Sequence, residues 1–225
     1  NAALSDMMRY MFQKKISAEN LAKIDELEQQ WLDQLNTGIE SAVKDRSVAY
    51  GKAVAAGIYE YSKTDGGHEQ YVTPFQLPYT WPTNAGAWKP TGAALNPLAP
   101  NWKSNRPFLP ENIAEAQPTP HMPFSTAPNS EFYKAALDVY NIVKSNTEEE
   151  VEITKFWADD PFNTCTPTGH TFNILGQLLE ENDASLGMAV VGYARLGIAE
   201  NDAFICCWKT KYDYFLVRPV TYIKE

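Results

Sequence analysis

Apolar residues recur with the period of an α-helix over the first 62 residues of the chain. In residues 1–62 they follow a 3.6-residue period, with Ser17 as the predicted N-cap and a break at residues 36–38. Gly51, Ala55 and Gly57 are small and allow another helix to approach closely. The apolar positions are Leu21, Ile24, Leu27, Trp31, Leu32, Leu35, Ile39, Val43, Val48, Val54 and Ile58.

The same periodicity returns in the second half of the chain. In residues 130–182, Ser130 is the predicted cap of one helix, and Thr147 with Glu150 forms a capping box for the next. Residues 185–217 predict one long helix or two in tandem. Glycines and alanines give this stretch a slim profile, so we expect it in the middle of a bundle, where neighbouring helices come close.

The stretch between these helical regions has a different character. Twelve of the chain's fifteen prolines fall between Pro74 and Pro128, which excludes long helices and central strands from residues 68–129. This stretch also carries large apolar rings, which a flexible linker rarely holds. The rings are Phe75, Tyr79, Trp81, Trp88, Trp102, Phe108 and Phe124. We therefore predict an all-α helical bundle, with residues 68–129 as an ordered, irregular strap rich in proline and aromatic residues.

Composition and charge narrow the class of partner. The chain has 225 residues, of which 44% are hydrophobic, enough for one substantial core or two small ones. Its net charge of −9 argues against nucleic acid or an anionic membrane as a main partner. No apolar run is long enough for a membrane span. Because the chain begins at Asn1 and not at Met, we expect a removed leader and an extracytoplasmic location, periplasmic or secreted, although no leader is visible.

The three cysteines do not suggest a disulfide framework or a metal site. Cys206 and Cys207 are adjacent, so in a helix they point in different directions. No spacing of cysteine and histidine resembles a zinc site. We expect all three cysteines to be buried small apolar residues, and we predict no metal-cation site.

The strongest candidate chemistry lies in the last fifteen residues. Lys211 and Arg218 are seven residues apart, about two helical turns, and so fall on one helix face. Trp208 and Phe215 share that face, and Pro219 pushes Arg218 out of helical geometry. Two cations among aromatic side chains are partly desolvated and need anionic partners, so this pair is suited to clamping a compact oxyanion. The simpler alternative is a solvated helix face on which the two charges meet by chance.

These residues resemble a known family. Lys-x6-Arg-Pro at residues 211–219 is similar to the first of three motifs of the type-2 phosphatidic acid phosphatase superfamily, which includes the vanadium-dependent haloperoxidases. The haloperoxidase branch is resembled in order by residues 155–159, 166–170 and 194–203, and more weakly by residues 88–91 and 101–108.

The resemblance implies that residues 1–225 are the N-terminal portion of a single helical domain of the acid phosphatase/vanadium haloperoxidase type. Lys211 and Arg218 would then bind the oxyanion, vanadate in a haloperoxidase, and a catalytic histidine would lie beyond residue 225. We expect the natural polypeptide to continue past Glu225, and this chain alone to be incomplete and inactive.

One histidine resembles a family motif in the wrong place. Pro167-Thr-Gly-His170 is similar to the Pro-Ser-Gly-His of the second motif, which in the family follows the first. Here it lies 41 residues before Lys211. We therefore predict that His170 is not part of the site and that this stretch is a helix start with Thr168 as N-cap.

Three functions remain open. The first is a haloperoxidase that binds vanadate and oxidises halide with peroxide. The second is a phosphomonoesterase on the same scaffold, which would act on a phosphoester through a phosphohistidine and need no cofactor. The third is a non-enzymatic helical binding module in which Lys211 and Arg218 are structural.

Overall fold

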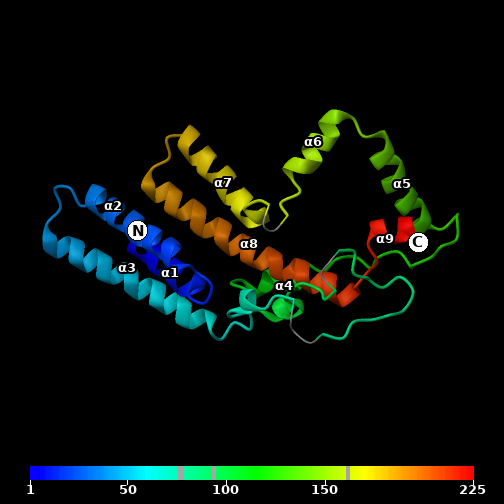
Figure 1. Ribbon diagram of the computed structural model, residues 1–225, viewed down its shortest axis with the longest axis horizontal. Helices are drawn as coiled ribbons and strands as arrows, with labels where there is room; N and C mark the ends of the chain where they lie inside the picture. Colours follow the sequence, from blue (N-terminus) through cyan, green and yellow to red (C-terminus); the bar gives the residue numbers. More distant parts are fainter. Residues whose placement is uncertain (76–78, 93–94, 161–162) are drawn as a thin grey trace. The chain divides into compact units, whose positions relative to one another are not determined.

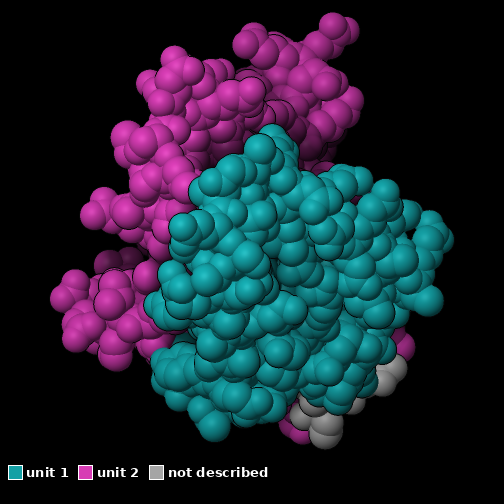
Figure 2. Space-filling model, turned by 90° about the vertical axis from the view of Figure 1, so that its left-hand side faces the viewer, with its two compact units in different colours: residues 1–78, 104–106 teal, residues 79–103, 107–225 magenta. Residues whose placement is uncertain are grey.

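The computed structural model describes residues 1–75, 79–92, 95–160 and 163–225. These residues form helices and irregular segments, with one isolated antiparallel bridge, so the predicted all-α class is confirmed for the described chain (Figure 1). The chain divides into two compact units, shown in two colours in Figure 2. Unit 1 comprises Asn1–Pro78 and Ser104–Arg106, and unit 2 comprises Tyr79–Lys103 and Pro107–Glu225. A single domain stays a prediction.

Unit 1 is built from the first three helices. They are α1 (Ala2–Phe12), α2 (Ala18–Leu35) and α3 (Ser41–Ser62), followed by the short η1 (Gln70–Val72). α1 packs against both α2 and α3. The cap predicted at the start of α2 is confirmed, since the Ser17 hydroxyl accepts a hydrogen bond from the Asn20 N–H at 3.1 Å. The predicted break between α2 and α3 is also present, with Gly38 at a φ of +76°.

Two of the three small residues of α3 bring it close to α1, as predicted, whereas a Cβ added to Gly57 would meet nothing within 4 Å. Ala55 is buried, and a Cβ added to Gly51 would lie 3.2 Å from the Ala3 nitrogen. The apolar stripe of α2 is less enclosed than its pattern predicts, because Leu27 and Trp31 are both exposed.

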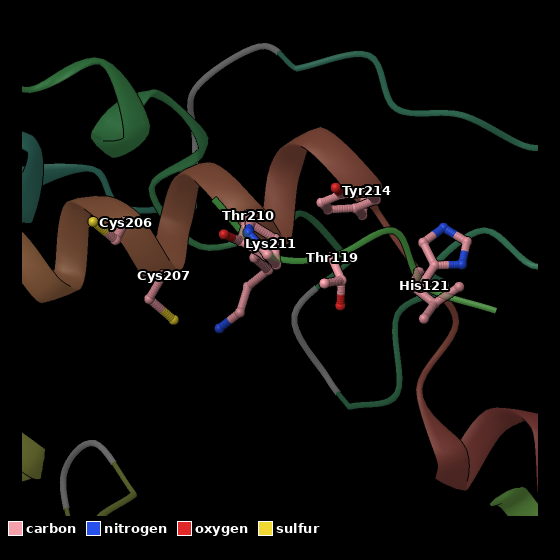
Figure 3. A pocket seen from close by; sticks show the side chains of 9 residues that line it. Thr119, His121, Cys206, Cys207, Thr210, Lys211 and Tyr214 are labelled. Atoms are coloured by element: carbon pink, nitrogen blue, oxygen red, sulfur yellow. The ribbon is translucent and has the colours of Figure 1, made fainter. Parts of the chain in front are cut away.

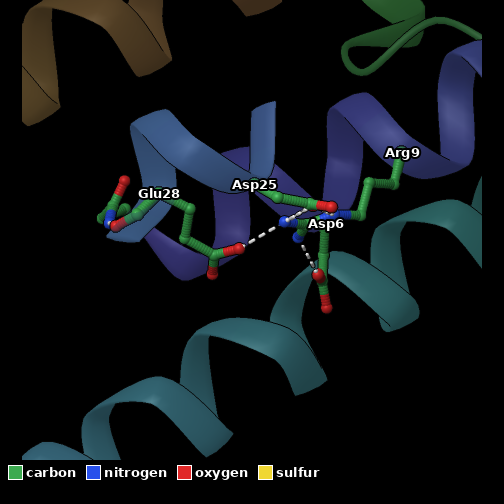
Figure 4. A network of polar contacts seen from close by, with 5 residues as sticks. Asp6, Arg9, Asp25 and Glu28 are labelled. Carbon is green, nitrogen blue, oxygen red and sulfur yellow. Dashed lines mark hydrogen bonds and ion pairs between the residues drawn. The ribbon is translucent and has the colours of Figure 1, made fainter. Parts of the chain in front are cut away.

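A charged network ties α1 to α2 (Figure 4). The Arg9 guanidinium donates hydrogen bonds to Asp6 within α1 and to Asp25 and Glu28 on α2. Burial lowers the pKa of Arg9, but the hydrogen bonds to these carboxylates outweigh it and raise the pKa above its ordinary value. The network therefore fixes how α1 lies on α2.

Unit 2 holds the remaining elements, except for Ser104 at the end of η2, which belongs to unit 1. They are η2 (Pro100–Ser104), α4 (Pro110–Glu115), α5 (Glu131–Ser145), α6 (Glu148–Phe156), α7 (Thr166–Glu181), α8 (Leu186–Tyr214) and α9 (Pro219–Lys224). The long α8 packs against α7 and α4, and α5 packs against α9. None of the helices in the described part of the chain is long and apolar enough to span a membrane.

Most of the predicted helix caps of unit 2 are present. Ser130 caps α5, and Thr147 with Glu150 forms the capping box of α6. The N-cap predicted at Thr168 is wrong, because α7 already begins at Thr166. Pro167 sets a helical φ in the first turn, and the N-cap is Cys165, three residues earlier than the predicted Thr168.

Parts of the proline-rich strap that belong to unit 2 lie against α8. The core of unit 2 is an aromatic cluster of Trp208, Tyr212 and Phe215, covered by Tyr79, Trp81, Trp88, Leu98, Trp102 and Phe204. The backbone carbonyl of Leu98 accepts two hydrogen bonds, from Trp208 Nε1 at 3.1 Å and from the Tyr212 hydroxyl at 2.5 Å. Burial of apolar rings and these two bonds together hold the strap on the helix.

A buried carboxylate makes a second attachment between the strap and α8. Asp202 is 1% exposed, and its two oxygens accept hydrogen bonds from the backbone N–H groups of Phe108 and Leu109 at 2.8 and 2.9 Å. The side chains of Asn112 and Asn201 donate two more. Burial raises the pKa of Asp202, but these hydrogen bonds outweigh it, and the pKa lies below its ordinary value. The carboxylate is therefore held ionised.

Two expectations about α8 are wrong for the described chain. The N-terminal half of the helix is not enclosed in a bundle, because Leu186 and Met188 are 81% and 63% exposed. The cysteines are not all buried either, since Cys165 and Cys207 are exposed and Cys206 is half-buried.

Candidate functional site

The helix that carries Lys211 ends before it reaches Arg218. α8 stops at Tyr214, and Phe215 takes left-handed backbone angles of φ 48° and ψ 41°. The Phe215 N–H still donates to the Lys211 carbonyl at 3.0 Å, closing the last turn. The prediction that Lys211 and Arg218 lie on one helix face is therefore wrong.

The reason for the early end is a pairing with the strap. The Val217 N–H donates to the Gly86 carbonyl, and the Trp88 N–H donates to the Phe215 carbonyl, each at 2.8 Å. Ala87 and Leu216 form an isolated antiparallel bridge between these bonds. The segment after α8 therefore satisfies its backbone by pairing with the strap in place of a further helical turn.

This pairing positions Arg218. As predicted from Pro219, Arg218 is extended, with φ −75° and ψ 147°, and it precedes the first residue of α9. Its guanidinium donates a hydrogen bond to the Thr91 hydroxyl at 2.6 Å and lies 5.6 Å from the ring centre of Trp88. Two strap residues, Thr91 and Trp88, thus orient the Arg218 side chain.

Lys211 occupies the last turn of α8. Its Nζ atom lies 4.6 Å from the ring centre of Trp208, one turn earlier on the same helix. Lys211 and Arg218 are both exposed, so the expected desolvation of the two cations is wrong for the described chain. Each cation nevertheless rests on an indole ring, a favourable electrostatic contact that limits the directions it takes.

The two cations line one pocket in spite of the helix break. Its volume is about 280 Å³, and its lining residues are Trp88, Pro97, Leu98, Trp208, Lys211, Tyr212, Phe215, Leu216 and Arg218. We refer to it as the oxyanion pocket. Burial raises the pKa of Tyr212, which lines the pocket, to about 12, although the positive charge of Arg218 acts in the opposite direction. The pocket therefore combines apolar walls with two positive charges.

The chemistry of this pocket favours an anion. Its lining contains no carboxylate, and among the described residues neither Lys211 nor Arg218 forms an ion pair. Lysine offers a point charge with three N–H donors, and arginine offers a planar fork that matches an oxyanion. In the described ranges, no group of three or more His, Cys, Asp or Glu side chains is arranged to hold a metal ion.

His170 lies elsewhere in unit 2. Its Nδ1 atom is 2.7 Å from a carboxylate oxygen of the buried Asp159, and the His170 side chain is 11% exposed. The imidazole stacks on Trp157 with ring centres 4.9 Å apart and meets the edge of Phe156. It does not line the oxyanion pocket as the described residues form it. Its exclusion from the site stays a prediction, and its contacts are those of a packed, hydrogen-bonded core residue.

Sequence reasoning did not assign the strap residues that orient Arg218. Trp88 and Thr91 belong to a stretch that resembles the haloperoxidase branch, but periodicity gives them no role. Their contacts with Arg218 span 130 and 127 positions of the chain. The only signal that pointed to them was that four-residue resemblance.

The fold and this pocket define an all-α protein with a cationic, aromatic-walled site at the end of its longest helix. No family model matches the chain, and no curated protein matches it. A solved structure does: the crystal structure of the first bacterial vanadium-dependent iodoperoxidase, with a TM-score of 0.80 and 26% sequence identity. The match covers 99% of this chain and 55% of that protein, so the chain spans about half of its relative's length. The chain therefore resembles the vanadium haloperoxidase branch, as its motifs predicted.

Proposed function

We propose that this chain is part of a vanadium-dependent haloperoxidase, in which Lys211 and Arg218 hold vanadate and the enzyme oxidises halide with peroxide. The observation that carries the proposal is the convergence of both cations on one pocket. The similarity over 99% of the chain to a vanadium-dependent iodoperoxidase supports it. We propose this activity for the whole protein, because it needs groups that residues 1–225 do not supply, including a histidine that bonds to vanadium.

The residues present fit an oxyanion. The pocket places a point charge and a guanidinium fork in one cavity without a competing carboxylate, which suits vanadate or phosphate and does not suit a metal cation. When bound, vanadate would supply the centre at which peroxide is taken up and halide oxidised. Lys211 and Arg218 would neutralise its charge, and Trp88, Trp208 and Phe215 would exclude water from one side.

The exposure of the two cations determines how tightly this chain binds. Opposite charges about 4 Å apart interact by about 1 kcal/mol in water and by about 4 kcal/mol at an effective dielectric of 20. In the described chain both cations are exposed, so the lower figure applies. We expect weak binding of vanadate by residues 1–225 and tighter binding by any longer form of the protein that shields the pocket from water.

Two alternative functions remain, one that uses the oxyanion pocket and one that does not. A phosphomonoesterase would use Lys211 and Arg218 for a phosphoryl group, because five-coordinate vanadate resembles the transition state of phosphoryl transfer. A helical binding module would use the cations only structurally. An extracytoplasmic location is proposed with each of these functions.

The test is a vanadate titration of the full-length protein by isothermal calorimetry, with Lys211→Ala and Arg218→Lys as variants. We expect each variant to weaken binding roughly tenfold or more, because about 1.4 kcal/mol corresponds to a factor of ten. Arg218→Lys keeps the charge and removes the fork, so a loss there tests geometry. His170→Ala should leave vanadate affinity unchanged.

Matched controls come from the same unit. Lys144 lies 4.6 Å from the ring centre of Tyr140, the same distance as Lys211 from Trp208, and Arg195 is exposed on α8. Lys144→Ala and Arg195→Lys should bind vanadate as the wild type does. Unchanged vanadate affinity in both Lys211→Ala and Arg218→Lys would refute the proposal that these two cations hold vanadate. Assays of peroxide-dependent iodide oxidation and of p-nitrophenyl phosphate hydrolysis separate a haloperoxidase from a phosphatase. Absence of both activities in the full-length protein would favour the binding module.

A further inference from the structure

A second pocket lies against Lys211, between α8 and the strap. It has a volume of about 500 Å³, and its walls come from strap residues 118–121 and from α8 residues 206–214, with Leu216 (Figure 3). We refer to it as the strap pocket. Lys211 and Leu216 line both this pocket and the oxyanion pocket. Figure 3 shows Lys211 and Cys207 extending from the same side of α8, with Thr119 and His121 on the strap.

The lining of the strap pocket is mostly apolar with a cation. Pro118, Tyr214 and Leu216 present carbon surface, and Lys211 is the positive charge of the lining. Thr119 and Thr210 add hydroxyl groups, and the lining contains no carboxylate. An apolar pocket with a few polar groups and one cation is suited to a small organic anion with a flat apolar body.

The position of His121 adds a hydrogen-bond acceptor. Its Nδ1 atom is 2.8 Å from the backbone carbonyl of Met122, and because a carbonyl only accepts, Nδ1 carries the hydrogen. In the neutral ring Nε2 is then an acceptor. The imidazole meets the Tyr214 ring edge-on, with ring centres 5.3 Å apart at 78°. The prolines at 120 and 123 restrict the backbone on either side of His121. A ligand hydroxyl is the natural donor to Nε2.

Lys211 connects the two pockets. A single ammonium group has three N–H donors and one positive charge, and here it lines both cavities. An anion bound on one side reduces the attraction that Lys211 offers to an anion on the other. Such coupling is reciprocal, so each ligand lowers the affinity of the other by the same factor.

We propose that the strap pocket binds a small aromatic carboxylate that carries a phenolic hydroxyl, with its carboxylate at Lys211 and its hydroxyl at His121. Lys211 couples this site to the oxyanion pocket. The coupling rests on the proposed function, whereas the binding itself does not. In a haloperoxidase, such a molecule would be held beside the site at which halide is oxidised.

The probe is 4-hydroxybenzoate, titrated into the 225-residue chain and followed by calorimetry and by the imidazole resonances of His121. We expect saturable binding that shifts those resonances. His121→Ala and Lys211→Met should each weaken binding about fivefold or more, while Lys144→Met and His68→Ala should bind as the wild type does. Circular dichroism of each variant shows that the fold is retained.

Benzoate separates the two polar contacts. It lacks the hydroxyl, so it should bind the wild type more weakly than 4-hydroxybenzoate does, and His121→Ala should bind the two probes equally. Equal binding of both probes by the wild type would overturn the role of His121. Absence of any His121 shift, or full affinity in both His121→Ala and Lys211→Met, would overturn the site.

Vanadate tests the coupling. Saturating vanadate should lower the affinity for 4-hydroxybenzoate about threefold or more in the wild type and have no effect on the residual binding in Lys211→Met. Unchanged affinity in the presence of bound vanadate would overturn the coupling. If 4-hydroxybenzoate binds and the full-length protein does not bind vanadate, the proposed function fails and the strap pocket stands. If vanadate binds and 4-hydroxybenzoate does not, the strap pocket fails alone.

Discussion

Replacing the buried carboxylate of Asp202 by an amide is the sharpest test of how the strap is held. In Asp202→Asn, one oxygen that accepts two hydrogen bonds becomes an NH₂ group that donates. Whichever way the amide turns, two of the four donors around it lose their acceptor, and at least one of them is the backbone N–H of Phe108 or Leu109. The variant is therefore expected to loosen the strap from α8.

The size of the effect follows from these contacts. Hydrogen bonds to a charged group contribute about 1.5–3 kcal/mol each, and removing a buried charge returns part of that loss. We expect Asp202→Asn to lower the free energy of unfolding of unit 2 by about 3 kcal/mol. The assay is urea unfolding followed by tryptophan fluorescence, since Trp102 and Trp208 lie in the core of unit 2. The matched control is Asp213→Asn, a more exposed α8 carboxylate paired with Lys103 and Lys209, which should cost less than about 1 kcal/mol.

The pH dependence gives an independent check. The pKa of Asp202 is lowered in the folded state, so the unfolded state takes up its proton at higher pH than the folded state does. The stability that this carboxylate contributes is present above its unfolded pKa of about 3.9 and is lost as the pH falls through the folded pKa. The difference between wild type and Asp202→Asn should therefore be constant from pH 5 to 7 and shrink below about pH 4. A loss of less than about 0.5 kcal/mol at pH 7, or a difference that does not change in acid, would refute the reasoning.

Three further predictions concern the same unit. Gly86 has a φ of +85°, and an added Cβ would lie 2.5 Å from Phe124, so Gly86→Ala should cost about 2 kcal/mol in urea unfolding, whereas Gly57→Ala, with open space around it, should not destabilise. Equal effects of the two substitutions would contradict this. The pKa of Tyr212 is raised to about 12, so its neutral form contributes stability that is lost as the pH rises from about 10 through 12, and Tyr212→Phe should flatten this alkaline decline. An unchanged slope between pH 9 and 12 would argue against it. Limited proteolysis should spare residues 79–103 and 107–128 until unit 2 unfolds, and rapid cutting throughout residues 74–128 with both flanks intact would make the strap a linker.

The helices and their caps were predictable because they depend on neighbours in sequence. Ser17, Ser130, Thr147 and Ser185 each accept a hydrogen bond from a backbone N–H three residues later. The extended backbone of Arg218 was equally local, since Pro219 imposes it. Such features need only a few consecutive residues to be read correctly.

The end of α8 was not predictable in that way. Phe215 adopts a left-handed conformation that is unfavourable for a residue with a Cβ, by about 1 kcal/mol or more. The pairing that stabilises it joins residues 215–217 to residues 86–88, far away in the chain. Periodicity therefore extended the helix face through Arg218, and only the paired strap shows why the helix stops.

Burial was the other property that the sequence did not determine. The apolar period of α2 and the slim profile of α8 are both real, yet Trp31 and Leu186 are exposed. A pattern shows which side chains favour a partner surface, but whether a surface meets them depends on tertiary neighbours. The contact of His170 with Asp159 is of the same kind, because it requires a turn between α6 and α7 that no period describes.

The strap is attached to its unit through its main chain as well as through its aromatic side chains. The attachment atoms are the carbonyl oxygens of Gly86, Leu98 and Ser125 and the backbone nitrogens of Trp88, Phe108 and Leu109. Several of the side chains that form hydrogen bonds with these atoms belong to the helices, namely Asp202, Trp208, Tyr212 and Tyr222. Strap side chains that neither pack on the aromatic cluster nor bond to the helices can therefore be exchanged without detaching the strap, provided that its backbone keeps its path. In a family of such proteins, or in a designed library, the strap is where new pocket walls can be tried while the helices keep the same anchoring residues.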